Sequence, residues 1–385
     1  MTADRIYFKG LNGIRAIAAL TVVVIHTGQY LYLFDLPPSP RYQWHWQSYA
    51  VTLFFVLSGF LITYLLLEEK KRTATVSLKG FYLRRILRIW PLYYLVVIGV
   101  VVAAEFLPAL AFPAISPKQL ALYAFLLANV ASVSGTVATP LTPLWSIGVE
   151  EQFYAIWPVI IKKSGNALRA LLGVIFLYLA VRAVCTVAGS QALNALVAET
   201  RIDCMAIGGV GALLLREKSK LLPYLYSYPA QVACWGIFLY SSIWKPIHIM
   251  SSIDHELYSV IFAIIILNVS TNPRTLVNLE NPFCDFLGKI SYGLYVYHMP
   301  IIFLLRTILK SSFGNQPAAW LVYVLVLGGT IVAAYLSYRF FELPFLRLKD
   351  RFSIVLSQGF AVGHEVQAAH SQSGSTGPVP KDPEG

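Results

Sequence analysis

Long apolar stretches separated by short polar loops run along most of the chain. Many are about 18 to 24 residues long, the length at which a helix crosses roughly 30 Å of hydrocarbon. Open strands would leave backbone groups without partners in lipid, and the alternating pattern of a membrane barrel is absent, so we interpret all of the stretches as helices. The predicted segments are, to within a few residues, 11–34, 47–67, 86–107, 118–135, 144–162, 167–188, 202–215, 229–243, 257–270, 288–309 and 318–341.

Basic residues predict how these segments cross the membrane. Seven Lys and Arg fall between Lys70 and Arg88, and a second group closes the last apolar segment, namely Arg339, Arg347, Lys349 and Arg351. Loops rich in Lys and Arg stay cytoplasmic. Eleven crossings cannot place both groups on one side, so either 118–135 or 144–162 should not cross. We therefore expect about ten spans in the plasma (cytoplasmic or inner) membrane, with both termini cytoplasmic.

Composition agrees with a lipid environment. Of the 385 residues, 57% are hydrophobic and 13% are charged, which is too little polar sequence to coat a soluble globule of this size. The formal net charge of +11 does not predict nucleic-acid binding, because the basic residues cluster beside apolar segments. The expected fold class is an all-α, polytopic bundle over residues 1–350. Residues 351–385, rich in Ser, Gly and Pro towards their end, are expected to form a disordered cytoplasmic tail.

The cysteines do not predict a metal site. Four are present, within or beside apolar segments and without metal-ligand spacing, at Cys185, Cys204, Cys234 and Cys284. We expect free thiols. The first apolar stretch carries Arg15 and lacks a convincing cleavage site, so it is expected to be the first span and not a removable signal peptide.

Arginine and histidine residues interrupt the first and third segments. Placing an ionisable side chain inside a membrane span costs free energy, so we expect each one to have a partner, a water-filled cavity or a function. Arg15 and His26 are eleven residues apart, hence on one helical stripe and about 16 Å from each other. In a functional interpretation, Arg15 holds an anion and His26 accepts or donates a proton. In the structural alternative, Arg15 is a membrane anchor and His26 is a packing residue. Arg85 and Arg88 share a helical face and are either a phosphate-binding patch or topology anchors.

Two adjacent acidic residues, Glu150 and Glu151, interrupt the apolar and aromatic stretch PLWSIGVEEQFYAIWP. Carboxylates in such surroundings favour proton transfer in an active site. The structural alternative is an ion pair with an intramembrane arginine such as Arg182.

Three further polar residues are weaker candidates for acceptor binding. Arg201 and Asp203 stand two residues apart at the mouth of a predicted span, and the alternative is that they satisfy each other. His298 lies in KISYGLYVYHMP and is either functional or a packing residue.

Seven motifs, in this order between Leu11 and Arg347, resemble the acyltransferase-3 family. They are GLNGIRAIAALTVVVIH, FFVLSGFLIT, FYLRRILRIWPLYY, PLWSIGVEEQFY, ETRIDCMAIGG, GKISYGLYVYH and SYRFFELPF. The resemblance implies a ten-helix domain that takes acetyl or a similar acyl group from cytoplasmic acyl-CoA, most often for a sugar hydroxyl. The family's patterns fall on the pairs singled out above: Arg15 with His26, Arg85 with Arg88, and Glu150 with Glu151.

The resulting hypothesis is a membrane O-acyltransferase. Coenzyme A phosphates are assigned to Arg15, Arg85 and Arg88. His26 acts as general base, Glu150 or Glu151 orients it, and Tyr154 donates to the oxyanion. Whether a covalent acyl-His or acyl-Tyr forms is left open.

The acceptor stays open at this stage. It is a surface or exported glycan, a lipid-linked sugar, or a small secondary metabolite. Some members of the family carry a C-terminal esterase-like domain, whereas this sequence ends in a short polar tail, so we expect it to act alone or with a separate partner. The rival classes are a proton-coupled transporter or exporter and a membrane scaffold; motif order argues against the first, and intramembrane His and Glu against the second.

Overall fold

Most of the described residues lie in helices, which confirms the predicted all-α class. The computed structural model describes residues 5–40, 45–110, 112–244, 247–249, 253–313, 317–353 and 355–357. The first seven helices are α1 (Leu11–Gln29), α2 (His45–Thr73), α3 (Leu78–Phe106), α4 (Pro117–Ala124), α5 (Ala128–Val133), α6 (Leu144–Lys163) and α7 (Ala167–Val187). They are followed by α8 (Gln191–Thr200), α9 (Ile202–Arg216), α10 (Leu222–Leu225), α11 (Tyr228–Ile243), α12 (Asp254–Thr271), α13 (Pro282–Lys289), α14 (Ser291–Phe313), α15 (Ala319–Ser337) and α16 (Leu343–Asp350).

Short 3₁₀ and π turns extend or join several helices. The 3₁₀ turn η1 (Tyr30–Phe34) prolongs α1, so the predicted segment 11–34 is continuous. Two more 3₁₀ turns, η3 (Pro108–Leu110) and η4 (Thr139–Leu141), lie in loops. The π-helical turn η5 (Tyr338–Glu342) connects α15 to α16, which keeps the chain helical from residue 319 to residue 350.

The predicted segment 118–135 is not one helix. It is divided into α4 and α5, because Leu126 adopts a left-handed backbone with φ 59°. The Leu127 amide bonds back to the Leu122 carbonyl at 2.8 Å, which closes the end of α4. Eight helical residues extend only about 12 Å, too short to cross a bilayer.

Six described helices are long and apolar enough to cross a membrane. They are Leu11–Phe34, Trp46–Thr73, Leu78–Phe106, Ala167–Val187, Ser291–Lys310 and Ala319–Asp350. The protein is therefore a multi-pass membrane protein. The remaining segments of the expected ten spans are shorter or carry more charge, and the number ten stays a prediction.

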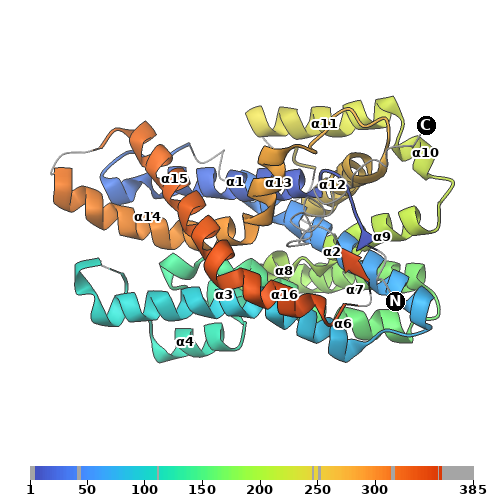
Figure 1. Ribbon diagram of the computed structural model, residues 1–385, viewed down its shortest axis with the longest axis horizontal. Helices are drawn as coiled ribbons and strands as arrows, with labels where there is room; N and C mark the ends of the chain where they lie inside the picture. The colour runs from blue at the N-terminus through green and yellow to red at the C-terminus, as the bar shows by residue number, and fades with distance from the viewer. Residues whose placement is uncertain are drawn as a thin grey trace, which may run out of the picture.

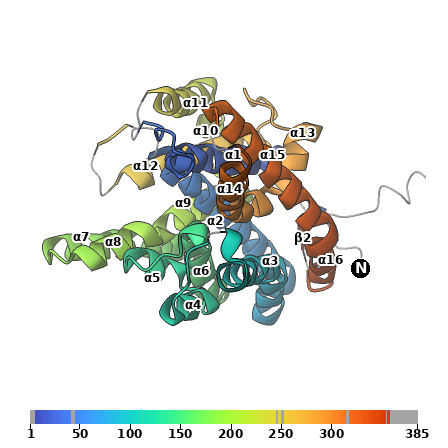
Figure 2. The same ribbon diagram turned by 90° about the vertical axis from the view of Figure 1, so that its left-hand side faces the viewer.

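Helices α1, α2 and α14 lie near the middle of the bundle, and α7 and α8 extend to one side (Figure 2). Helices α2 and α9 approach closely because glycines meet there. A Cβ atom on Gly59 would lie 1.9 Å from the Met205 carbonyl oxygen, and one on Gly208 would lie 2.0 Å from the Val56 carbonyl oxygen. Small residues at such a crossing let two backbones touch, which is a common way to pack helices in lipid.

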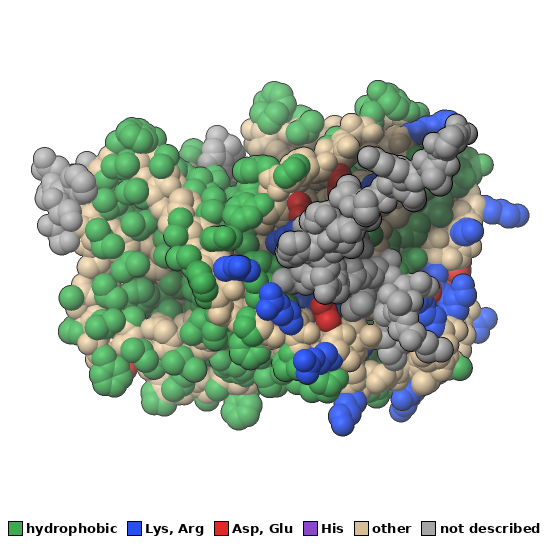
Figure 3. Space-filling model, viewed as in Figure 1, with side chains coloured by type: hydrophobic (Ala, Val, Ile, Leu, Met, Phe, Trp, Pro, Cys, Tyr) green, Lys and Arg blue, Asp and Glu red, His purple; other side chains and the backbone are tan. Residues whose placement is uncertain are grey.

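The two ends of the described chain meet at one end of the bundle. Strand β1 (Arg5–Ile6) pairs in parallel with β2 (Leu356–Ser357), at the right of Figure 1. Lys and Arg side chains gather towards the same end, while the opposite end of this face is largely apolar (Figure 3). Of the tail expected over 351–385, residues 354 and 358–385 lie outside the described residues.

Candidate active site

A cavity of about 140 Å³ opens between α1, α2, α3, α6 and α14. Five residues singled out from the sequence line it, namely Arg15, Arg85, Arg88, Glu150 and Tyr154. Most of the remaining wall is apolar or aromatic, including Ile6 and Phe8 beside β1. The fold thus gathers charged residues of three separate motifs into one space that is otherwise suited to an apolar chain.

The arginines of this cavity are held by neighbouring side chains. Arg15 donates from Nη1 to Asn12 Oδ1 at 3.2 Å. The Arg85 guanidinium lies 5.5 Å from the centre of the Tyr154 ring and 5.6 Å from that of Phe81, a cation–π geometry. Its Nε is buried and has no hydrogen-bond partner among the described residues. A guanidinium fixed in this way retains a donor for an anionic ligand.

The acidic pair is divided between two environments. Glu150 lines the cavity and interacts electrostatically with Arg88 and Arg85. Glu151 does not line it and accepts a hydrogen bond from Trp90 Nε1 at 3.0 Å. Neighbours on a helix point about 100° apart, which accounts for the difference. The cavity therefore receives one carboxylate of the two.

Tyr154 lies one helical turn after Glu150. Its hydroxyl is 2.5 Å from Ser58 Oγ on α2, and Ser58 also lines the cavity. The Tyr154 hydroxyl and the Ser58 hydroxyl therefore form a polar pair on the cavity wall.

The two histidines singled out from the sequence pair with each other. His26 Nδ1 on α1 lies 2.8 Å from His298 Nε2 on α14, and the rings stack at 5.0 Å between their centres with an interplanar angle of 9°. Both side chains are buried. The described structure contains no hydrogen bond from His26 to Glu150 or Glu151, so the partner of His26 is an imidazole and not the carboxylate considered above.

The histidine pair begins one side chain beyond the cavity wall. Neither histidine lines the cavity, but Tyr295 does, and its ring centre is 6.0 Å from that of His298. The Tyr295 hydroxyl donates to the Pro143 carbonyl oxygen at 3.0 Å and lies 2.8 Å from Ser146 Oγ. Tyr295 thus separates the cavity from the histidines.

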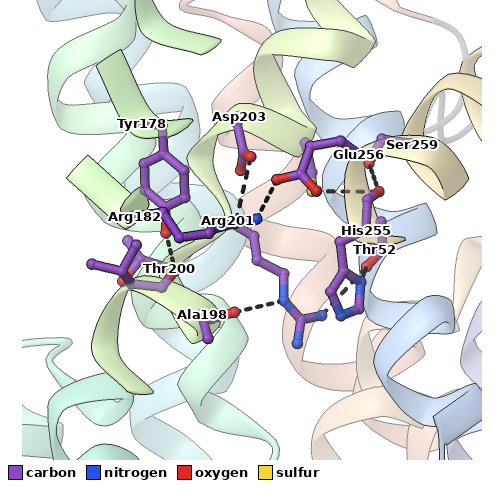
Figure 4. Close-up of polar contacts among 12 residues, drawn as sticks. Thr52, Tyr178, Arg182, Ala198, Thr200, Arg201, Asp203, His255, Glu256 and Ser259 are labelled. Carbon is purple, nitrogen blue, oxygen red and sulfur yellow. Dashed lines mark hydrogen bonds and ion pairs between the residues drawn. The ribbon is translucent and has the colours of Figure 1, made fainter. Parts of the chain in front are cut away.

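Arg182 forms a separate polar cluster at α7, α9 and α12 (Figure 4). Its guanidinium lies 2.5 Å from Glu256 and 3.5 Å from Asp203. Arg182, which the sequence offered as an example of an intramembrane partner for the acidic pair, thus has Glu256 and Asp203 as ion-pair partners.

Arg201 belongs to the same region but has different partners from Asp203. It donates to the Ala198 carbonyl oxygen at 2.9 Å and to Thr52 Oγ1 at 3.3 Å, two residues labelled in Figure 4. It also donates to Ser48 Oγ at 2.8 Å. The two residues therefore have different hydrogen-bond and ion-pair partners, although they stand only two residues apart in sequence. The cluster connects α2, α7, α9 and α12, and its residues do not line the cavity.

Several residues of the site were not singled out from the sequence. Ser58, Ser146 and Tyr295 are hydroxyl residues of the cavity wall. Ser146 and Tyr295 stand in motifs whose ionisable members drew attention first, and Ser58 stands in the uncharged motif FFVLSGFLIT. A Ser or Tyr in an apolar helix gives only a weak signal, because it bonds to a neighbouring carbonyl oxygen at little cost.

The described residues contain no group of three or more His, Cys, Asp or Glu side chains that could hold a metal ion. The four cysteines are free thiols, as expected.

Fold and cavity together define a multi-pass helical membrane protein with a charged site among its helices. The sequence model of the acyltransferase-3 family, described as an acyltransferase domain, matches residues 8–339. That match covers most of the chain, which therefore belongs to this family.

The chain is also similar to two curated bacterial proteins. One is the peptidoglycan O-acetyltransferase OatA of Listeria monocytogenes, 25% identical over 368 residues, which cover 89% of this chain and 56% of that protein. Another is the O-acetyltransferase OatA of Staphylococcus aureus, 27% identical over 369 residues, which cover 88% and 57%. This chain thus spans little more than half the length of these relatives. No solved structure matches it significantly.

Proposed function

We propose that the protein is a membrane O-acyltransferase that moves an acetyl or similar acyl group from cytoplasmic acyl-CoA to a hydroxyl of a surface or exported glycan. The observation that carries this proposal is the convergence of Arg15, Arg85 and Arg88 with Glu150 and Tyr154 in one cavity. The names of the relatives support an O-acetyl transfer, and one of them names peptidoglycan, a glycan, as the acceptor.

The donor would bind with its phosphates at the arginines and its thioester arm among the apolar residues. Guanidinium groups bind phosphate oxygens with two parallel hydrogen bonds, which an ammonium group cannot do. Arg85 and Arg88 stand near the start of α3, beside the basic loop that is expected to be cytoplasmic. Arg15 lies in the same cavity, within electrostatic reach of Arg85 and Glu150.

The transfer itself needs a base and an oxyanion donor. The acceptor hydroxyl would meet the thioester at Tyr295, the wall residue between the cavity and the histidines. Its oxygen attacks the thioester carbonyl carbon, its proton passes to the general base His26 behind this wall, and the carbon–sulfur bond breaks to release coenzyme A thiolate, which is then protonated. His298 holds the His26 ring and accepts or donates through their shared hydrogen bond. Tyr154, beside Ser58, would stabilise the oxyanion.

A coenzyme A release assay tests this function. The purified protein in nanodiscs is mixed with acetyl-CoA and a glycan acceptor, and free thiol and acetylated glycan are measured. We expect both products to appear together. Proton-coupled flux of a solute through proteoliposomes, without binding or turnover of acetyl-CoA, would overturn the proposal and assign the same residues to transport.

A further inference from the structure

A second, smaller pocket adjoins the first one. Its volume is about 30 Å³, and α2, α3, α16 and the segment after α16 enclose it. Four cationic residues and two carboxylates line it: Arg84, Arg85, Arg88, Lys349, Glu69 and Asp350. Four positive against two negative side chains leave a surplus of two positive charges, so the pocket attracts an anion.

Lys349 reaches this pocket because the chain turns back over α3. After η5, helix α16 packs across α3 (Figure 1), which brings a residue from the end of the fold to the Arg85 region. Lys349 is only 7% exposed, and its ammonium lies 3.3 Å from Asp350 and within electrostatic reach of Arg85 and Arg88. A buried lysine beside two arginines adds to the positive potential at this place, which favours an anionic ligand in the pocket.

Arg84 completes the pocket from α3. Its Nη2 lies 3.1 Å from Glu69 Oε2, while Glu69 Oε1 accepts a hydrogen bond from the Ser77 amide at 2.7 Å. Glu69 is therefore engaged on both of its oxygens. It positions Arg84 at the pocket wall and offsets its charge, so the surplus of two positive charges comes from Arg85, Arg88 and Lys349 against Asp350.

Arg85 and Arg88 line both spaces and so stand at their boundary. A ligand extending from the larger cavity into the smaller pocket would pass from apolar surroundings, over two arginines, to Lys349 and Arg84. Coenzyme A has its groups in a matching order: an uncharged thioester arm, a diphosphate, and a ribose with a separate 3′-phosphate.

We propose that Lys349 and Arg84 form the binding site of the 3′-phosphate of the acyl-CoA donor, with Arg85 and Arg88 at its diphosphate. This inference rests on the proposed function, because it assumes that the donor is a coenzyme A thioester. It adds a site residue from the last helix of the fold.

Two donors that differ only in this phosphate test the site. Dissociation constants are measured by calorimetry for acetyl-CoA and 3′-dephospho-acetyl-CoA with the full chain in nanodiscs. The wild type should bind acetyl-CoA about tenfold or more tightly than the dephospho form. A difference of this size in the dissociation constant is expected when one charge-assisted hydrogen bond is lost. Lys349→Gln should lose most of this preference by weakening acetyl-CoA alone, and Lys349→Arg should retain it.

Arg347→Gln is the matched control, because Arg347 is exposed on the same helix. It should keep the full preference. If Lys349→Gln fails to fold, Arg84→Gln tests the same phosphate site from α3. The ratio of the dissociation constants of the two donors for the wild type tests the site without any variant.

The outcomes separate this inference from the proposed function. A wild type that binds neither donor overturns the proposed function. A wild type that binds both donors equally, or folded Lys349→Gln and Arg84→Gln proteins that keep the full preference, overturns the phosphate site and leaves the acyltransferase proposal in place.

Discussion

Glu150 and Glu151 are neighbours in sequence, yet only Glu150 reaches the cavity. Glu150 interacts electrostatically with the arginines of the cavity, whereas Glu151 bonds to the indole of Trp90. Two adjacent glutamates thus have different surroundings: Glu150 lines the cavity, and Glu151 packs against Trp90. Chemical type alone could not separate them, because the distinction depends on which face of α6 points inward.

The two glutamates should therefore differ on substitution. We expect Glu150→Gln to lower coenzyme A release by at least roughly tenfold, because it removes the one carboxylate of the cavity that faces the arginines. Glu151→Gln should change turnover little and cost about 1 kcal/mol of stability, because it weakens one hydrogen bond to Trp90. Release rates and thermal unfolding of both purified variants check this. A larger catalytic loss in Glu151→Gln would contradict the assignment.

His26→Ala should separate a base from a binding residue. Loss of a positioned base typically lowers turnover by about 10² to 10⁴-fold, and we expect the affinity for acetyl-CoA to stay within a few-fold of wild type. The physical reason is that His26 lies behind Tyr295 and does not line the donor cavity. Single-turnover acetyl transfer and donor binding are the measurements.

His248→Ala is a suitable control for this experiment, because His248 is exposed and bonds to Asp254 away from the cavity. It should transfer acetyl at the wild-type rate. A folded His26→Ala protein that still works at close to that rate would end the general-base assignment and move it to His298.

The sequence predicted most of the charged residues of the cavity, and the reason is physical. An Arg or Glu in a lipid-embedded helix is costly enough to stand out without any structure, as Arg15 and Glu150 do. Lys349 did not stand out, because it follows the last apolar segment and there resembles an ordinary cytoplasmic anchor. Its partners come from α3, more than 260 residues earlier in the chain.

At the scale of the elements, the hydropathy pattern predicted the long helices, but it did not predict where a helix is interrupted. Segment 118–135 is as apolar as its neighbours, but the left-handed Leu126 divides it. A leucine carries no signal for that conformation, unlike glycine. Helices α8 and α13 were also missed, because short helices with polar residues leave no apolar block of spanning length.

The contact of α2 with α9 is the element-scale feature most sensitive to a single methyl group. We expect Gly59→Ala to lower stability by roughly 1–3 kcal/mol, because the new Cβ would overlap the Met205 carbonyl group and force the helices apart. Thermal unfolding in detergent measures the effect.

Gly99→Ala on α3 is the matched control. A Cβ there meets nothing within 4 Å, and alanine is a better helix former than glycine. Its unfolding temperature should equal or exceed that of the wild type. Equal unfolding temperatures for Gly59→Ala and the wild type would show that the two helices separate without cost.

At the scale of the whole molecule, we expect ten spans with both termini in the cytoplasm. The basic loops predict this orientation, and the pairing of β1 with β2 is consistent with it because it places both ends of the described chain together. A phosphatase reporter fused to the C-terminus should be inactive, and one fused after residue 40 should be active. An active C-terminal phosphatase would exclude the ten-span arrangement.

The pairing of β1 with β2 also fixes the order in which the protein becomes functional during its synthesis. Ile6, in the first strand, lines the large cavity, and Val355, beside the second strand, lines the small pocket. A ribosome makes the N-terminal part of a chain first, so α1 to α15 can enter the membrane while β1 still lacks its partner. Lys349 and Val355 emerge only after all of these helices. A nascent chain therefore carries the arginines and Glu150 before the small pocket has its last wall, and the pocket can close only after residue 355 has been made.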